Sequence, residues 1–217
     1  MFQHIHPYEP FFPDGATKLI VGTLPPPRFT TRELNERDVD FCYGSSNGLL
    51  WPVLDRIFKL NLKFETTQEA REQRIRFLTS RGIGVCDIVQ SCEREKVDAS
   101  DLGMQNSKLR DIIGYLHKYP KIDTLLFTGG NSKNGPEYFF RKHLKTYQKK
   151  LEVVSDEIPR IHQFTLENRT VKTVSLTAPS GAANRAIGSL PLYKSLKNKN
   201  PNFNTLDFRV MQYKAFF

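Results

Sequence analysis

Cysteine is scarce in this sequence, and long apolar runs are missing. The three cysteines, Cys42, Cys86 and Cys92, are too few for a disulfide framework or a four-cysteine iron–sulfur cluster. No stretch approaches the roughly 18 consecutive apolar residues of a membrane span, so we expect no transmembrane helix. The first residues contain neither a basic region nor an apolar stretch, which argues against a secretory signal and predicts a cytoplasmic protein.

Residues with metal-ligand spacing are also sparse. Cys86 and Cys92 lie six positions apart, and no histidine follows either at zinc-finger spacing. His4 and His6 alternate, as residues on one face of a strand do, but no third ligand is nearby in the sequence. We therefore expect neither a metal ion nor a cofactor.

Acidic residues are under-represented in one half of the chain. Residues 1–100 hold 13 basic and 14 acidic residues, whereas residues 101–217 hold 19 basic and only 9 acidic ones. The excess is gathered in two clusters, one of Arg141, Lys142, Lys145, Lys149 and Lys150 and one of Lys194, Lys197 and Lys199. A basic half of this kind attracts polyanions, of which nucleic acid is the commonest. The alternative is a basic face that only keeps the protein in solution.

The apolar pattern predicts a single α/β domain over residues 1–217, preceded by an irregular arm over residues 1–16. We expect strands over 18–22, 82–89, 122–127 and 171–176. Residues 153–154 and 161–166 are not assigned by their pattern, and a β-hairpin with the strand over 171–176 is one interpretation of them. We expect helices over 50–60, 67–80, 107–117 (with Ser107 as its N-cap), 137–150, 190–196 and 206–213. Because strands alternate with helices, a mostly parallel sheet covered on both faces is predicted. Residues 28–48 are expected to form a long functional loop.

Unusual segments follow the expected strands. They are GTLPPP (22–27), CDIVQSC (86–92), TGGNSKNG (128–135) and TAPSGAANR (177–185). Ligands of parallel sheets bind beyond the carboxyl ends of the strands, so these segments predict a shared site. The first is a rigid turn and not a phosphate-binding loop, because prolines lack the N–H donors of a phosphate cradle.

Several side chains in or near these segments suit a nucleobase. Tyr43 is placed to stack on an extruded base, whereas the helical pattern around Trp51 indicates a core residue. Asn47 carries an amide that can orient a water molecule or read a base edge. Asp87 is either a general base or the cap of a turn. Ser180-Gly181 can offer N–H groups to a phosphate, or form an ordinary turn.

Together these motifs carry a resemblance to a known family. The ordered set GTLPPP, FCYGSSNGLLWPVL, GVCDIVQSCER and SLTAPSGAANR resembles the uracil-DNA glycosylase superfamily, nearest its mismatch-specific and hypoxanthine-DNA glycosylase branches. The likeness spans about residues 17–195. It implies a three-layer α/β/α fold with a central, mostly parallel four-stranded sheet. It also implies a monofunctional glycosylase, acting as a monomer, that flips uracil or hypoxanthine out of double-stranded DNA and removes it by hydrolysis.

The resemblance also implies roles for individual residues. Asn47 and Asp87 would be catalytic. The base would be held by Gly22, Thr23, Leu24, Pro25 and Tyr43. The DNA would be contacted by Pro179, Ser180, Gly181, Asn184 and Arg185.

The sequence departs from the family at several positions, including Ser45-Ser46 in place of a His-Pro pair and Pro26 in place of a Gly. Leu24 stands where the mismatch-specific branch has a water-activating Asn, and Gly48 stands where the hypoxanthine branch has an Asn, with Asn47 one residue away. A catalytically weak or inactive nucleic-acid-binding member of the same fold is therefore the alternative. A small nucleotide-binding α/β protein is a third reading.

Overall fold

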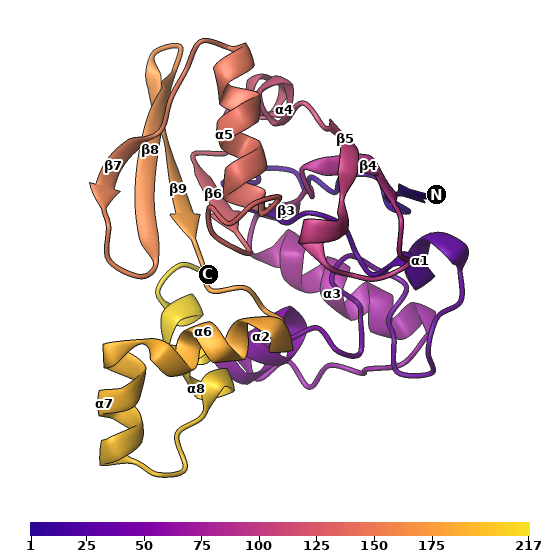
Figure 1. Cartoon of the computed structure of the whole chain (residues 1–217), viewed down its shortest axis with the longest axis vertical. Coiled ribbons are helices and arrows are strands. Elements are labelled where there is room, and N and C mark those ends of the chain that lie inside the picture. Colours follow the sequence, from indigo (N-terminus) through magenta and orange to yellow (C-terminus); the bar gives the residue numbers. More distant parts are fainter.

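A six-stranded, mostly parallel sheet flanked by helices forms the centre of the protein (Figure 1), as described by a computed structural model of residues 1–217. Its strand order is β3-β2-β6-β9-β8-β7. The strands are β2 (Lys18–Val21), β3 (Ile83–Val85), β6 (Thr124–Phe127), β7 (Glu152–Ser155), β8 (Arg160–Leu166) and β9 (Arg169–Ser175). Adjacent pairs from β3 to β9 run parallel, and β8 and β7 continue the sheet antiparallel.

The prediction of a mostly parallel α/β sheet is confirmed, and the four expected strands form its parallel part. The sheet nevertheless has six strands rather than four. The additional two form an antiparallel hairpin with β9, in which Ile161 pairs with Val174 and Phe164 with Val171. This hairpin, at the upper left of Figure 1, places β7 at the sheet edge.

A second, smaller sheet corrects three expectations. It is antiparallel, with β4 (Val89–Arg94) between β1 (Phe2–Ile5) and β5 (Gln105–Leu109). The expected irregular arm therefore contains a strand, and the strand expected over 82–89 is divided into β3 and the start of β4. Ser107 is not a helix cap, because pairing with β4 holds its segment extended. Helix α4 (Ile112–Lys118) begins after Asp111, whose side chain accepts a hydrogen bond from the Gly114 amide.

The remaining helices agree closely with the apolar pattern. α2 (Leu50–Phe58), α3 (Gln68–Ser80) and α5 (Pro136–Thr146) lie within or beside their expected ranges. The segment expected as a loop over 28–48 overlaps a short helix, α1 (Pro27–Thr31). The C-terminal part folds into α6 (Asn184–Ser189), α7 (Pro191–Lys199) and α8 (Thr205–Lys214), at the lower left of Figure 1. None of the helices combines the length and apolar character that crossing a membrane requires.

Alternation along the central strands divides the core into two clusters. In β2, Leu19 and Val21 belong to one cluster, which includes residues of α4 and α5, and Ile20 belongs to the other, with residues of α2, α3 and α8. Because successive side chains of a strand point to opposite faces, the two clusters lie on opposite faces of the sheet. The core thus fixes the sheet from both sides and leaves the strand ends free to carry loops.

The last helix supplies a test of local stabilisation. The Asn204 side chain accepts hydrogen bonds from the Leu206 and Asp207 amides, and the Asp207 carboxylate accepts one from the Asn204 amide. This reciprocal cap satisfies donors that the first helical turn otherwise leaves unpaired. We expect Asn204→Ala to lower the free energy of unfolding by about 1 kcal/mol in urea titrations. Asn202→Ala, in the same loop but with no hydrogen bond from its side chain, is the control; an equal loss in both variants would contradict this account.

Candidate functional site

The four unusual strand-end segments border one cavity of about 340 Å³, called here the base cavity after the nucleobase that the sequence analysis expects at this edge of the sheet. Thr23, Leu24, Pro25 and Pro26 follow β2, Asp87 follows β3, Thr128 follows β6, and 178–181 follow β9. Residues 43–48 of the long loop close a further side. The meeting of these segments follows from parallel topology, since the carboxyl ends of parallel strands share one edge of the sheet.

A buried carboxylate organises this cavity from within. One oxygen of Asp87, Oδ1, accepts hydrogen bonds from the Gly22 amide (2.9 Å) and the Tyr43 hydroxyl (2.8 Å). The other, Oδ2, lies 2.9 Å from His6 Nε2. His6 Nδ1 accepts a hydrogen bond from the Tyr8 amide, which leaves Nε2 as the nitrogen that donates to Asp87. The arm that holds His6 is therefore tied directly into the site.

Its surroundings determine the charge state of Asp87. Burial alone raises the pKa of a carboxyl group, but the hydrogen bond and charge of His6, with the Tyr43 hydrogen bond and the Arg110 charge, hold the pKa of Asp87 below its usual value. Asp87 is thus a carboxylate with both oxygens occupied. Of the two roles considered for it, this geometry favours the structural one, in which Asp87 positions Tyr43.

Tyr43 is held in a conformation that few side chains adopt. Its φ of 58° is left-handed, and its hydroxyl reaches both Asp87 and, at 3.3 Å, Thr128 Oγ1. Burial and the nearby Asp87 raise the pKa of Tyr43 well above its usual value, so the phenol keeps its proton and donates. Its ring lines the base cavity, where the sequence predicted a stacking residue.

Gly22 leaves the space that this arrangement needs. A Cβ atom at Gly22 would lie 2.2 Å from the Tyr43 hydroxyl and 2.7 Å from Asp87 Oδ1. Of the residues predicted to hold the base, only Gly22 does not line the cavity. Its backbone amide donates to Asp87 instead. Thr23 and Leu24, by contrast, line the cavity, and their backbone amides donate to no other group of the protein.

Asn47 lines the base cavity, and its side-chain amide has no hydrogen-bond partner in the protein, whereas its backbone amide donates to Ser45 Oγ at 3.3 Å. The loop that carries it is firmly held. Arg28 donates two hydrogen bonds to Asp38 and one to Ser45 Oγ, and the Ser46 amide donates to Asp38. Burial alone raises the pKa of Asp38, but the hydrogen bonds from Arg28 and the Ser46 amide hold this pKa well below its usual value. Asp38 and Arg28 therefore remain a charged pair.

Asp101 is a carboxylate of the cavity wall that sequence reasoning missed. It lies in a single 3₁₀ turn, η1 (Asp101–Gly103), and its Oδ1 accepts a hydrogen bond from Thr23 Oγ1 at 2.8 Å. Its Oδ2 accepts none. Burial, with a smaller contribution from the charge of Asp87, raises the pKa of Asp101 despite the Thr23 hydrogen bond and the Arg94 charge. Asp101 is thus a stronger base than an exposed carboxylate.

Two side chains from outside the turn hold the segment that carries Asp101. Arg94 is buried in β4 and donates to the Ser100 carbonyl at 2.6 Å. Asn134, in the segment after β6, donates to the carbonyls of Asp101 (2.9 Å) and Met104 (3.0 Å). The sequence signals nearest to it were the polar segment 128–135 and Glu93-Arg94 at the end of β4, and neither indicates Asp101 by itself.

The predicted DNA-contacting residues are only partly brought together. Pro179, Ser180 and Gly181 line the cavity, and an isolated bridge joins Ser180 to Gly48 across its mouth. Asn184 and Arg185 lie outside it in α6, both exposed. Asn184 instead accepts a hydrogen bond from Arg209, a fully buried residue of α8 that also donates to the carbonyls of Ala178 and Ser180. Arg209 was missed because these three partners, within 178–184, are far away from it in the sequence.

The alternating histidines at the N-terminus have separate partners. His4 accepts a hydrogen bond from Arg94, and burial, with the Arg94 charge, lowers the pKa of His4 to about 4. His6 pairs with Asp87 instead. No group of three histidine, cysteine or carboxylate side chains is arranged to hold a metal ion.

A basic hollow of about 330 Å³, called here the lysine hollow, lies along α5. The first basic cluster of the sequence lines it, together with Tyr138 and Asn131. Arg141 is paired with the buried Glu137, but the four lysines form no ion pair. The hollow contains no acidic side chain, so its potential is uncompensated and favours a polyanion. Its lysines are Lys142, Lys145, Lys149 and Lys150.

A scan of this chain against models of protein families found no match, and a search of curated proteins also found none.

The state of Asp87 predicts how stability depends on acidity. Because the pKa of Asp87 is lowered in the folded chain, its ionised form stabilises the fold at neutral pH. This contribution is complete above the unfolded carboxyl pKa of about 3.9 and is lost as the pH falls through the lower folded value. We expect the free energy of unfolding to fall less between pH 5 and about 3 in Asp87→Asn than in the wild type.

Urea titrations at several pH values measure this difference. Asp14→Asn is the matched control, because Asp14 is exposed and makes no hydrogen bond. It should keep the wild-type pH dependence. An equal pH dependence in the wild type and Asp87→Asn would contradict the lowered pKa of Asp87 in the folded chain.

Proposed function

We propose that the chain is a monofunctional DNA glycosylase that flips a deaminated base, uracil or hypoxanthine, and removes it by hydrolysis. The supporting observation is the base cavity of about 340 Å³ at one sheet edge. It is lined by Tyr43, by Thr23 and Leu24 with their unpartnered backbone amides, and by Asp101, which has one free carboxylate oxygen. Such a cavity is the size of a site for a small planar ligand. The three-layer arrangement and the family resemblance belong to this proposal.

DNA is the partner in this proposal. The lysine hollow holds phosphates through counterion release, and the turn at Pro179–Gly181 meets the strand at the cavity mouth. Rotating the nucleotide out of the duplex costs a few kcal/mol, least for a base that pairs poorly. Stacking on Tyr43 offsets this cost, since a base–aromatic stack contributes about 1–3 kcal/mol. Asp87 orients the Tyr43 ring for this contact by accepting a hydrogen bond from its hydroxyl.

Base removal then needs a stabilised leaving group and an activated water. As the N-glycosidic bond breaks, its electron pair stays with the base, and the sugar becomes positively charged. The amides of Thr23 and Leu24 donate to the base anion, because no protein group competes for them. Water adds to the sugar carbon and gives up a proton, leaving an abasic sugar. The released base takes up a proton in turn.

Two side chains of the cavity wall act on that water. The free oxygen of Asp101 takes its proton, a role that suits a carboxylate whose pKa is raised. The side-chain amide of Asn47 orients the water, and it is available for this because no protein group occupies it. Leu24, at the position of the family's water-activating Asn, takes no part. Asp87 assists only through Tyr43.

The alternative is a nucleic-acid-binding protein of the same fold that does not cleave. The observation that favours it is the exposed, unanchored amide of Asn47, together with Leu24 at the usual Asn position. Under this alternative the lysine hollow and base cavity bind DNA, and no abasic product forms.

A base-release assay on duplexes with a single uracil or hypoxanthine distinguishes the two. We expect the wild type to generate abasic sites, and Asp101→Asn and Asn47→Ala each to slow release roughly 10²–10⁴-fold. The rise in rate with pH that comes from ionisation of Asp101 should also be missing in Asp101→Asn. Glu95→Gln, an exposed substitution near the same turn, is the matched control and should release the base at the wild-type rate.

Each other result has a definite meaning. Unchanged release in Asn47→Ala would remove that amide from the mechanism, and unchanged release in Asp101→Asn would remove the carboxylate. Salt-sensitive binding by the wild type with no abasic product would favour the binding protein. Failure to retain DNA at low salt would overturn both and favour a small nucleotide-binding protein.

A further inference from the structure

A second cavity lies directly beyond the wall that carries Asn47. It has a volume of about 470 Å³ and is called here the flanking cavity. Gly48 lines both cavities, so a single stretch of chain separates them. That stretch is the loop fixed by the buried pair of Arg28 and Asp38. The two cavities are therefore held side by side at a constant separation.

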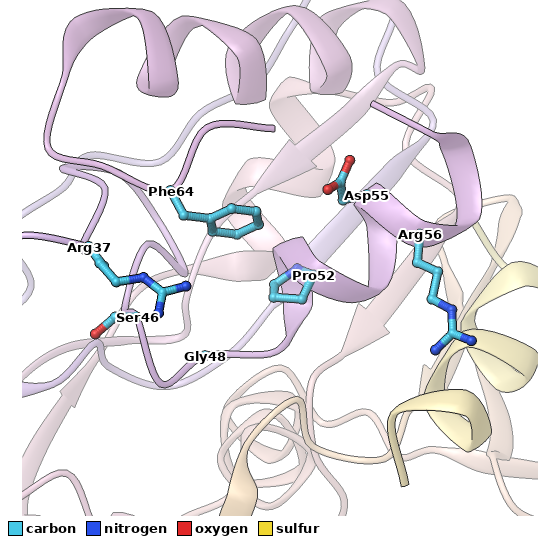
Figure 2. A pocket seen from close by; sticks show the side chains of 7 residues that line it. All are labelled: Arg37, Ser46, Gly48, Pro52, Asp55, Arg56 and Phe64. Carbon is cyan, nitrogen blue, oxygen red and sulfur yellow. The ribbon is translucent and has the colours of Figure 1, made fainter. Parts of the chain in front are cut away.

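The flanking cavity combines an apolar surface with cations. Figure 2 shows the Phe64 ring and Pro52 in its middle, with Arg37 and Arg56 at opposite sides. Arg37 is exposed and has no hydrogen-bond or ion-pair partner, whereas Arg56 is paired with Asp207. Asp55 adds one carboxylate, whose Oδ1 accepts a weak hydrogen bond from the Leu62 amide at 3.3 Å.

A buried cation behind the cavity strengthens its preference for negative charge. The guanidinium of Arg74 is fully buried between two rings, 5.1 Å from the Phe64 centroid and 5.4 Å from the Trp51 centroid. Its Nε and Nη2 have no hydrogen-bond partner. Burial lowers the pKa of Arg74 to about 10, which still leaves it charged at neutral pH. Because Arg56 is neutralised by Asp207, the cations that outweigh the charge of Asp55 are Arg74 and the unpaired Arg37.

We propose that the flanking cavity binds the nucleotide next to the flipped one, with its base on Phe64 and its phosphate at Arg37. This inference rests on the proposed function, because the neighbouring nucleotide is placed by the one in the base cavity. A planar base suits the half-buried ring and Pro52, and an exposed guanidinium suits a phosphate. The Asp55 carboxylate accepts from a base amino group, as carboxylates do from cytosine. The occupant is one nucleotide of the same strand, since one loop separates the two cavities.

Equilibrium binding of uracil-containing duplexes tests this assignment. One duplex is intact, and two others lack the base of the nucleotide on the 5′ or the 3′ side of the uracil. We expect loss of one of these bases to weaken wild-type binding about tenfold, within the range of a base–aromatic stack. In Phe64→Leu, which keeps an apolar side chain, the intact duplex should bind about tenfold more weakly, and the penalty for the missing base should disappear. Fluorescence anisotropy gives the dissociation constants.

A second variant tests the phosphate contact without touching the core. Arg37→Gln should weaken binding of every duplex several-fold and reduce the salt dependence by about one counterion. Arg76→Gln, an equal change of charge on α3, is the control and should bind as the wild type does. Thermal unfolding of Phe64→Leu shows whether the variant folds; if it does not, Arg37→Gln decides alone.

The failures of the two proposals are distinguishable. The flanking cavity is not a nucleotide site if the wild type binds the duplexes and releases uracil but both variants fail to respond. In that case the missing neighbouring base weakens binding equally in the wild type and in Phe64→Leu, and Arg37→Gln binds DNA as tightly as the wild type. If the wild type retains no duplex, the proposed function and this inference fall together. The inference would also be overturned if a protein ligand bound at Phe64 and the affinity for DNA stayed the same as without that ligand.

Discussion

The buried carboxylate of Asp87 is the interaction on which the rest of the site depends. It joins the N-terminal arm through His6, the turn after β2 through Gly22, and the long loop through Tyr43. An unpaired charge at this depth would cost several kcal/mol, so the three partners are needed together. Glycine at position 22 is required because any Cβ would enter the space of the Tyr43 hydroxyl. A single carboxylate thereby holds together the three segments that meet at the base cavity.

The parts of the fold that could be predicted are those with a local signal. The apolar runs at Leu19–Val21 and Leu125–Phe127 are bounded by glycine and proline and gave correct strands. Once those strands run parallel, the meeting of their terminal segments follows from topology. For this reason the prediction placed the segments after the strands at one cavity, as Thr23 and Leu24 show. Tyr43 and Asn47 lie in the loop over 28–48, and their place at the cavity was expected from their side-chain chemistry and from the family resemblance.

What could not be predicted depends on contacts between distant segments. Ser107 lies in a stretch with helical spacing, yet pairing with β4 makes it a strand. Asp101 stands in a polar segment without periodicity, and it reaches the cavity only because Arg94 and Asn134 hold its turn. The role of Asp87 was left open for the same reason. Its partner His6 is 81 residues away, so the sequence does not show whether the carboxylate is free or bonded.

The central claim is that the base cavity receives an everted nucleobase on the ring that Asp87 holds in place. A crystal structure of the protein bound to a duplex with one deaminated base tests this most directly, and a non-cleavable sugar analogue keeps the complex intact. The account predicts that the base lies against Tyr43, with its sugar carbon near the free oxygen of Asp101. A base that stays stacked within the duplex, or DNA bound away from the cavity, would contradict it.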